Sequence, residues 1–245
     1  MLPSAPWTER RRALRDLFET IAPSYDRLNH LLSLGIDRRW RRATAREALR
    51  EAPPGPVLDL ASGTGDLAVA LRRQDGARMI VRLDLSESLL RIAVPKLREV
   101  ERDRPQQAGA PAVVAEMERI PLRPGSCAAV TMGFALRHIQ SLPSLLHACA
   151  IVLAPGGRVA FVDMSLPRSG AWGIAYRLYF RKILPRAARL FGGDRAAYEA
   201  MVRSVETFPG WDALATAARE AGFVDVRSIP WTGDAARLFL ATKSR

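Results

Sequence analysis

The chain has 245 residues, of which 48% are hydrophobic and 25% are charged, and this suits one large α/β domain with an added segment. Its two cysteines, Cys127 and Cys149, are too few for a disulfide framework and lack the spacing of metal ligands. No stretch reaches the roughly 18 apolar residues of a membrane span, and the opening MLPSAPWTERRR has no signal-peptide core, so we expect a cytoplasmic protein.

The formal net charge of +12 informs about partners rather than about the fold. It fits a nucleic-acid ligand, an anionic membrane surface, or an arginine-rich proteome encoded by a GC-rich genome. Arginine clearly outnumbers lysine, and this favours the last explanation for part of the excess.

Residues 1–50 precede the predicted sheet and are expected to form an N-terminal helical cap. Apolar residues recur at helical spacing over 10–20, and Pro23 ends that predicted helix. An apolar stretch, 31–36, and a basic cluster, 37–42, follow it. Because the apolar residues need burial, we expect the segment to cover the carboxyl edge of the sheet rather than form a solvated tail.

The segment Val57–Ala70 reads VLDLASGTGDLAVA, which predicts a strand, a turn of small residues and a helix. Gly63 and Gly65 allow backbone angles closed to other residues and a close approach of ligand to main chain. A pyrophosphate site would read G-x-G-x-x-G. Here Asp66 stands at the helix start, where it repels phosphate but tolerates a ligand that carries an amine and a sulfonium.

The second predicted strand ends in an acid, Asp84. The natural role of such an acid is a bidentate hydrogen bond to the 2′,3′-diol of a ribose. A first strand that carries an acid, the glycine turn after it, and an acid at the end of the second strand are together typical of class I S-adenosylmethionine-dependent methyltransferases. A plain dinucleotide site is the alternative that these residues leave open.

From residue 56 onward, strands and helices alternate as a doubly wound sheet requires. Pro95 is expected to kink or delay the second helix. The fold class is therefore α/β, with a doubly wound, seven-stranded, mostly parallel sheet in 51–245 and a helical insertion before the last two strands. The predicted strands are 56–61, 79–85, 112–116, 127–133, 157–164, 223–229 and 237–243, and the predicted helices are 66–74, 86–103, 141–153 and 211–221.

The insertion covers about 168–209 and interrupts the alternation. No acid occurs between Met164 and Gly193. A basic helix with an aromatic stripe can lie on a membrane surface or line a lipid-sized slot. The aromatic stripe alone favours an alternative interpretation, in which this helix packs into the cap. The absence of acids favours contact with a membrane surface instead. The residues predicted to share one helical face are Trp172, Tyr176, Tyr179, Phe180, Ile183 and Leu184, with Arg177 and Arg181 off it.

Five stretches resemble, in order and spacing, the C-methyltransferases of menaquinone and ubiquinone biosynthesis. They are FETIAPSYDRLNHLLSLGIDRRWRR over 18–42, VLDLASGTGDLA, AEMERIPL, MGFALRHI and VLAPGGRVAFVDMSLP. The resemblance implies S-adenosyl-L-methionine as cofactor and methylation of a ring carbon of a prenylated quinol, with demethylmenaquinol favoured. A polyprenyl benzoquinol of the ubiquinone pathway and another small aromatic acceptor stay open.

The resemblance also assigns cofactor-binding positions. Asp84 and Leu85 lie at the ribose, Glu116 and Met117 at the adenine, and Gly133 occupies a position that the family often fills with serine. The residues that it assigns to the glycine turn are Asp59, Ala61, Gly63, Thr64 and Gly65.

Three residues are expected to carry the chemistry. Arg137 is always cationic, so it suits an oxyanion stabiliser; a surface salt bridge is its alternative role. His138 titrates near neutrality and can take a proton, unless it only bonds a loop carbonyl. Tyr25 can donate a hydrogen bond to the acceptor hydroxyl, or merely pack. The chemistry needs no metal.

Two positions depart from the family pattern and leave the exact acceptor open. His138 stands where the family has Asn after Leu-Arg, and Thr232-Gly233-Asp234 with Phe239 replaces Thr-Gly-Gly with His. A nucleic-acid methyltransferase suits the charge but lacks its Asn/Asp-Pro-Pro-aromatic segment after the fourth strand, and we expect no nucleic-acid partner. A non-catalytic, cofactor-binding partner subunit is the alternative of another class. Nothing in the sequence predicts the oligomeric state.

Overall fold

The structure is a computed structural model. It describes residues 30, 33, 35–102, 109–167, 170–183, 186 and 203–245. The helix predicted over 10–20 and the predicted site residue Tyr25 lie outside the described residues.

The described strands form a seven-stranded sheet in the order β3-β2-β1-β4-β5-β7-β6. All neighbouring pairs are parallel except those that involve β7, which runs antiparallel to β5 and β6. This confirms the predicted doubly wound, mostly parallel sheet. The strands are β1 (Val57–Leu60), β2 (Ile80–Asp84), β3 (Ala112–Val114), β4 (Cys127–Gly133), β5 (Leu153–Met164), β6 (Phe223–Trp231) and β7 (Ala236–Lys243).

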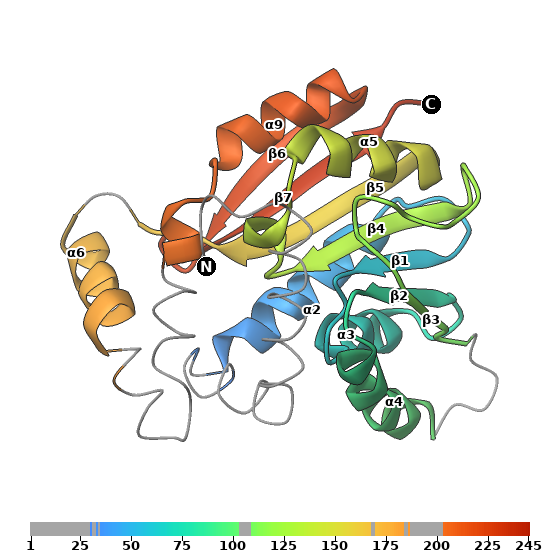
Figure 1. Cartoon of the computed structure of the whole chain (residues 1–245), viewed down its shortest axis with the longest axis horizontal. Helices are drawn as coiled ribbons and strands as arrows, with labels where there is room; N and C mark the ends of the chain where they lie inside the picture. Colours follow the sequence, from blue (N-terminus) through green and yellow to red (C-terminus); the bar gives the residue numbers. More distant parts are fainter. Residues whose placement is uncertain are drawn as a thin grey trace.

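Helices cover both faces of the sheet, and Figure 1 shows them in two layers. One apolar core lies between the sheet and α5 and α9, and a second lies between the sheet and α2, α3 and α4. The described helices are α2 (Ile36–Leu49), α3 (Asp66–Gln74), α4 (Glu87–Glu101), α5 (Leu142–Val152), α6 (Gly170–Leu178) and α9 (Trp211–Glu220), with a 3₁₀ turn at Leu136–His138 and a π turn at Tyr179–Ile183.

Several predicted boundaries differ from the structure by a few residues, most clearly at the start of the fifth strand. The fifth strand begins at Leu153 rather than at 157, because Leu153 pairs with Cys127 across an irregularity before regular pairing resumes at Arg158. The second helix after the glycine turn runs through Pro95 without ending.

The bounds of α2 were not predicted within the helical cap expected over 1–50, since 37–42 was interpreted only as a basic cluster. In the structure Asp37 is buried in its first turn, and Ala45 and Ala48 pack under the sheet with no exposed surface. The helix contacts α3, β4 and β5. Its first two turns therefore lie beside the carboxyl ends of the central strands.

The outer edge of β6 is irregular. Its register with β7 shifts between Val224 and Arg227, and Asp225 there has a φ of 52°. A proline, Pro230, follows in the same strand. Among the described helices, none combines the length and apolar content needed to cross a bilayer.

Candidate active site

The strand order changes direction at β1 and β4, and ligands of open α/β sheets bind beyond the carboxyl ends of the strands at such a point. The glycine turn after β1 lies there. Ala61, Gly63 and Gly65 have φ values of 48°, 54° and 83°. A Cβ on Gly65 would lie 2.5 Å from the Cβ of Ala93, so glycine lets α3 and α4 approach closely.

Asp59 lies behind this turn and has no exposed surface. Its carboxylate accepts hydrogen bonds from Ser62 Oγ at 2.7 Å and from Thr131 Oγ1 at 2.8 Å. Burial raises the pKa of Asp59 to about 6, although both hydroxyls and the charge of Arg41 oppose the rise. In this position Asp59 shapes the turn, and its direct contact with a ligand stays a prediction.

Asp84, the predicted ribose acid, ends β2 beside the turn. Its Oδ2 accepts from the backbone N–H of Gly63 at 2.8 Å, and its Oδ1 accepts from the backbone N–H of Ser86 at 2.8 Å. The residue is 9% exposed. The two backbone bonds orient the carboxylate of Asp84 beside the turn, and its contact with a ribose diol stays a prediction.

The other predicted cofactor residues lie along the same edge. Thr64 is buried within the turn, and Leu85 is half-buried between Asp84 and α4. Glu116 and Met117 follow β3 and are half-buried, and Met117 packs against the apolar core under α5. Sequence positions that were predicted to share one ligand therefore follow the ends of β1, β2 and β3.

At the end of β4 the chain turns sharply. Phe134 has a φ of 63°, which is strained for a non-glycine residue and is a feature that clusters at functional sites. The guanidinium carbon of Arg41 lies 4.7 Å from the centre of the Phe134 ring, and the Trp40 ring lies 6.2 Å from it. A Cβ on Gly133 would lie 3.3 Å from Nη1 of Arg41. Trp40 and Arg41 are thus site residues that were not predicted.

Arg137 forms a buried ion pair with Asp163, with Nη1 and Oδ1 2.8 Å apart and side chains 6% and 5% exposed. Asp163 Oδ2 also accepts from the backbone N–H of Leu136 at 2.8 Å. Burial raises the pKa of Asp163, and Arg137 opposes the rise. The surface salt bridge considered for Arg137 is wrong, because this pair is enclosed. Asp163 was not predicted, although an acid inside an apolar strand requires a partner.

His138 is half-buried in the 3₁₀ turn that follows. Burial, with the positive charge of Arg137 beside it, holds the pKa of His138 well below its usual range. The imidazole is therefore neutral at neutral pH. The expectation that His138 titrates near neutrality is wrong, because burial and the neighbouring cation make its protonated form unfavourable.

The hairpin between β6 and β7 meets two helices from distant parts of the chain. Trp40 Nε1 of α2 donates to Thr232 Oγ1 at 3.1 Å, and Trp172 Nε1 of α6 donates to the carbonyl of Gly233 at 3.1 Å. Phe239 does not belong to this group. It is fully buried and stacks on Phe161, with ring centres 6.2 Å apart.

His30 bridges two carboxylates beside the turn. Its Nδ1 lies 2.8 Å from Asp37 Oδ2, and its Nε2 lies 3.1 Å from Asp66 Oδ2. Lys96 donates to Asp66 at 2.7 Å, and Arg41 Nε lies 3.4 Å from Asp37. Because these cations already occupy the carboxylate oxygens, we interpret the cluster as an ion network rather than a metal site.

The predicted aromatic stripe of the insertion is divided in the structure. Phe180 is buried, and its ring stacks on Tyr176 at 5.9 Å. Trp172 and Ile183 are 50% and 51% exposed instead. The π turn at Tyr179–Ile183 accounts for Ile183, because its wider spacing rotates the side chains that follow out of a regular helical stripe. Trp172 precedes that turn and instead donates to the carbonyl of Gly233. Leu184, the last residue of the predicted stripe, lies outside the described residues.

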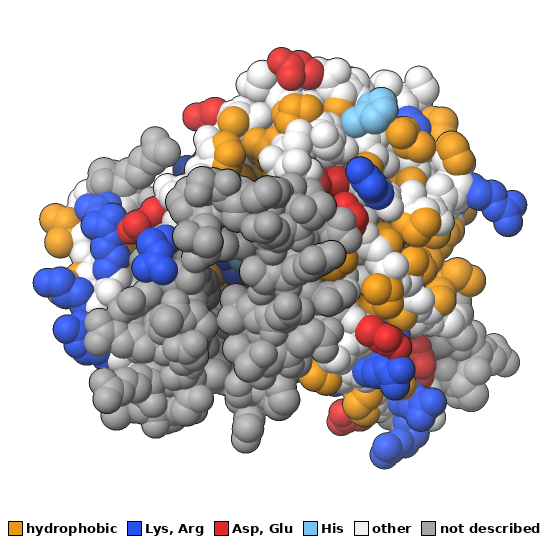
Figure 2. All heavy atoms as spheres, in the orientation of Figure 1, with side chains coloured by type: hydrophobic (Ala, Val, Ile, Leu, Met, Phe, Trp, Pro, Cys, Tyr) orange, Lys and Arg blue, Asp and Glu red, His pale blue; other side chains and the backbone are white. Residues whose placement is uncertain are grey.

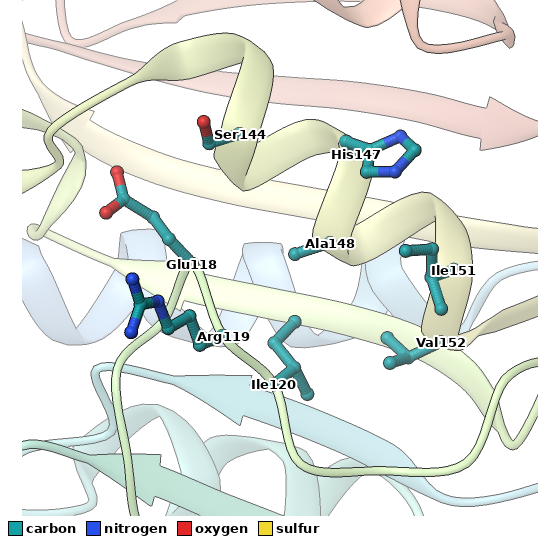
Figure 3. A pocket seen from close by; sticks show the side chains of 8 residues that line it. All are labelled: Glu118, Arg119, Ile120, Ser144, His147, Ala148, Ile151 and Val152. Atoms are coloured by element: carbon teal, nitrogen blue, oxygen red, sulfur yellow. The ribbon is translucent and has the colours of Figure 1, made fainter.

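A separate surface pocket of about 440 Å³ lies between the loop after β3 and α5. Figure 3 shows Glu118 and Arg119 on the loop and Ser144 and His147 on the neighbouring helix. Glu118 accepts from the backbone N–H groups of Gln140 and Ser141, so its role there is structural. None of the predicted site residues lines this pocket.

Comparisons with known proteins agree with this geometry. Residues 7–243 match the family model that is described as the ubiE/COQ5 methyltransferase family. The chain is 38% identical over 230 residues to the ubiquinone/menaquinone biosynthesis C-methyltransferase UbiE of Syntrophotalea carbinolica, covering 94% of each chain. It is 34% identical to the demethylmenaquinone methyltransferase of Chlorobaculum parvum, covering 96% of this chain and 95% of the relative.

Among solved structures, a SAM-dependent methyltransferase from Thermotoga maritima superposes with a TM-score of 0.61 at 17% identity. The superposition covers 94% of this chain and 99% of that one. This likeness supports the class I methyltransferase fold that the strand order shows.

Proposed function

The chain belongs to the ubiE/COQ5 methyltransferase family, and from that premise we propose that it transfers a methyl group from S-adenosyl-L-methionine to a ring carbon of a prenylated quinol. Demethylmenaquinol is the acceptor that we favour, because relatives covered along nearly their whole length carry that activity in their names. The observation that supports the cofactor assignment most directly is the bond between the Gly63 N–H and Asp84.

The residues present fit this cofactor. The glycine turn leaves the main chain open to close approach, and Asp84 is oriented as an acceptor for a ribose diol. The carboxylate of Asp66 at the helix start disfavours a phosphate, which a dinucleotide would bring. When bound, S-adenosyl-L-methionine supplies an electrophilic methyl group and a neutral thioether as leaving group.

The remaining chemistry falls to residues of this chain. A quinol ring carbon is most nucleophilic when the adjacent hydroxyl is ionised, so the site must stabilise an oxyanion. In this scheme Asp163 holds Arg137 through Nη1, and the guanidinium donors outside that pair stabilise the oxyanion. In this scheme His138, which is neutral before the reaction, accepts the proton that leaves the ring after methyl transfer. Tyr25 donates to the acceptor hydroxyl in this scheme.

An assay with reduced and oxidised prenylated quinones tests the proposal. The purified protein should methylate reduced demethylmenaquinone, with the product identified by mass, and should leave the oxidised quinone unchanged without a reductant. Reduced prenylated benzoquinones, in parallel, test the acceptor class. Equal turnover of the oxidised quinone would contradict activation through an oxyanion.

We propose further that α6 and the π turn rest on an anionic membrane surface, where such a lipid-like substrate resides. Ile174, Leu178 and Ile183 are 64%, 49% and 51% exposed. Arg181 and Lys182 are exposed beside them, and Figure 2 shows basic side chains gathered over α6 at the left of the view. Exposed apolar side chains among cations suit the interface of an anionic bilayer.

Co-sedimentation with vesicles tests this contact. Binding should rise with the content of anionic lipid and fall with salt. Replacing Ile174, Leu178 and Ile183 together by Gln should reduce it, whereas the control Ile151→Gln, at an apolar side chain 43% exposed on α5, should not. Equal sedimentation of the triple variant and the parent would assign α6 to the cap alone.

A further inference from the structure

Arg41 is held in place from two sides at the mouth of the site. Its Nε lies 3.4 Å from Oδ2 of Asp37, one helical turn earlier on α2, and its guanidinium carbon lies 4.7 Å from the centre of the Phe134 ring. The side chain is only 13% exposed. A long, mobile side chain is therefore fixed in a single direction.

The other end of the guanidinium has no partner among the described residues. Nη1 and Nη2 donate to none of them. Nη1 lies 3.3 Å from the point that a Cβ on Gly133 would occupy, and Leu67 of α3 borders the same point at 3.4 Å. Glycine at the end of β4 thus gives room to this group. Partly buried cationic donors without an acceptor are costly, and they indicate a place for an anion.

The surroundings restrict which anion fits. The charge of Arg41 acts on both Asp59 and Asp66, so the guanidinium lies close to the two acids that flank the glycine turn. A phosphate would add at least one full negative charge beside these carboxylates and would bring no cation of its own. A zwitterionic amino-acid group brings its own ammonium to the acids and one carboxylate to the arginine.

We propose that Arg41 binds the α-carboxylate of the methionyl end of S-adenosyl-L-methionine. The inference rests on the proposed function, since it assigns a ligand atom to the same cofactor. It extends the cofactor site beyond the sheet to α2, and it gives Gly133 a role as the residue that leaves space for the guanidinium.

Two ligands that differ only in the amino-acid group test the proposal by calorimetry. S-adenosylhomocysteine carries that group, whereas 5′-methylthioadenosine keeps adenine, ribose and sulfur without it. In Arg41→Gln, the affinity for S-adenosylhomocysteine should fall at least about tenfold, as for loss of a charge-assisted hydrogen bond. The affinity for 5′-methylthioadenosine should change less than about twofold, because this ligand has no carboxylate for Arg41 to bind.

Arg42→Gln is the matched control, since Arg42 is the next residue on α2, is exposed and donates to the carbonyl of Arg38. It should leave both affinities unchanged. An equal loss for both ligands in Arg41→Gln, or no loss for either, would overturn the proposal. A parent protein that binds neither ligand would overturn the cofactor assignment itself, so the two failures are distinct.

The parent protein offers a test that does not depend on a variant folding. It should bind S-adenosylmethionine at least about tenfold more tightly than decarboxylated S-adenosylmethionine, which keeps the ammonium and sulfonium but lacks the carboxylate. Equal affinities would overturn the proposal, and Arg41→Lys, which keeps the charge but not the planar fork, should reduce the preference.

Discussion

On the cofactor side of the site, formed by Asp59, Ala61–Gly65 and Asp84–Ser86, the bonds within the side join groups that are close in sequence, and Thr131 adds one bond to Asp59 from 72 residues away. Ser62 and Asp59 are 3 residues apart, Ser86 and Asp84 are 2 apart, and Gly63 and Asp84 are 21 apart. On the acceptor side, formed by Trp40, Arg137, Asp163, Trp172 and Thr232–Asp234, the bonded pairs are separated by 26, 61 and 192 residues.

The difference separates two ways of building a site. A short motif can fix its own backbone, and the cofactor side does so with buried carboxylates that accept backbone and hydroxyl hydrogen bonds. The acceptor side depends on how helices and a hairpin from distant segments pack, and its tryptophan hydrogen bonds are exposed. Its buried element is the pair of Arg137 and Asp163.

The largest effect should come from this buried pair. Asp163→Ala leaves the guanidinium of Arg137 enclosed without its partner and the N–H of Leu136 without an acceptor. We expect a loss of about 3–5 kcal/mol in the free energy of unfolding, measured by urea denaturation. Glu87→Gln, which breaks the exposed pair with Arg91 at 2.7 Å, is the control and should leave the free energy of unfolding nearly unchanged, because both side chains are solvated. If both substitutions lowered the free energy of unfolding by a similar amount, the pair of Arg137 and Asp163 would not stabilise the acceptor side as a buried ion pair.

Asp59 should make the cofactor side sensitive to pH. Its pKa is raised from 3.8 to about 6 in the folded state, so the folded protein binds a proton between these values that the unfolded chain does not. The contribution of Asp59 to stability therefore decreases as pH rises from about 4 to about 6, by roughly 3 kcal/mol at most.

Thermal unfolding of Asp59→Asn against the parent, at pH 4.5 and 7.5, measures this. The variant should lose less stability than the parent on going to the higher pH. Asp212→Asn, at an exposed acid on α9, should follow the parent. If Asp59→Asn showed the same pH dependence of stability as the parent, Asp59 would not be the group responsible for that dependence.

On the same side, Asp84→Ala should weaken binding of S-adenosylhomocysteine by about 1.5–3 kcal/mol, because it removes a charged acceptor for two hydroxyls. It also leaves the N–H of Gly63 without its partner. Calorimetry measures the affinity, and Asp75→Ala, in the loop after α3, serves as control. An unchanged affinity in a folded Asp84→Ala protein would contradict the ribose assignment.

The smallest effect is expected at the hairpin. Thr232→Val removes the acceptor of Trp40 Nε1 at an exposed position, so the free energy of unfolding should fall by about 1 kcal/mol or less. The KM for the quinol should rise more than kcat falls, since the contact positions the wall of the acceptor side. Thr207→Val is the control, because Thr207 bonds within its own segment. A fall in kcat at unchanged KM would place Thr232 nearer the chemistry than we propose.

The sequence predicted the sheet, the glycine turn and the position of Asp84 at the end of a strand for a common reason, and the binding roles of these residues stay predictions. The periodicity of apolar segments and the turn residues act locally, so the strands, the glycine turn and Asp84 could be located before any packing was known. The boundary of β5 was wrong by a few residues because pairing across an irregularity depends on β4 rather than on local residues.

The acceptor side was harder because its signals lie in pairs of distant residues. Asp163 within FVDM required a partner, but only the register of β4 and β5 brings Arg137 to it. In α2, the buried Asp37, Thr44, Ala45 and Ala48 share one helical face with Arg41, and this spacing was a signal available in the sequence. The buried positions of α2 distinguish Arg41, which lies on the face toward the sheet, from the neighbouring arginines of the same helix.

The irregular edge of β6 has a consequence for the protein at high concentration. An exposed edge strand offers its unpaired backbone groups to other chains, and a long, regular edge can extend into intermolecular sheets. In β6 the shift between Val224 and Arg227 breaks the spacing of those groups, the charge of Asp225 stands at the break, and Pro230 has no N–H to offer. The outer edge of β6 therefore offers no regular row of backbone hydrogen-bonding groups to a strand of another molecule, and this disfavours extension of the sheet between molecules.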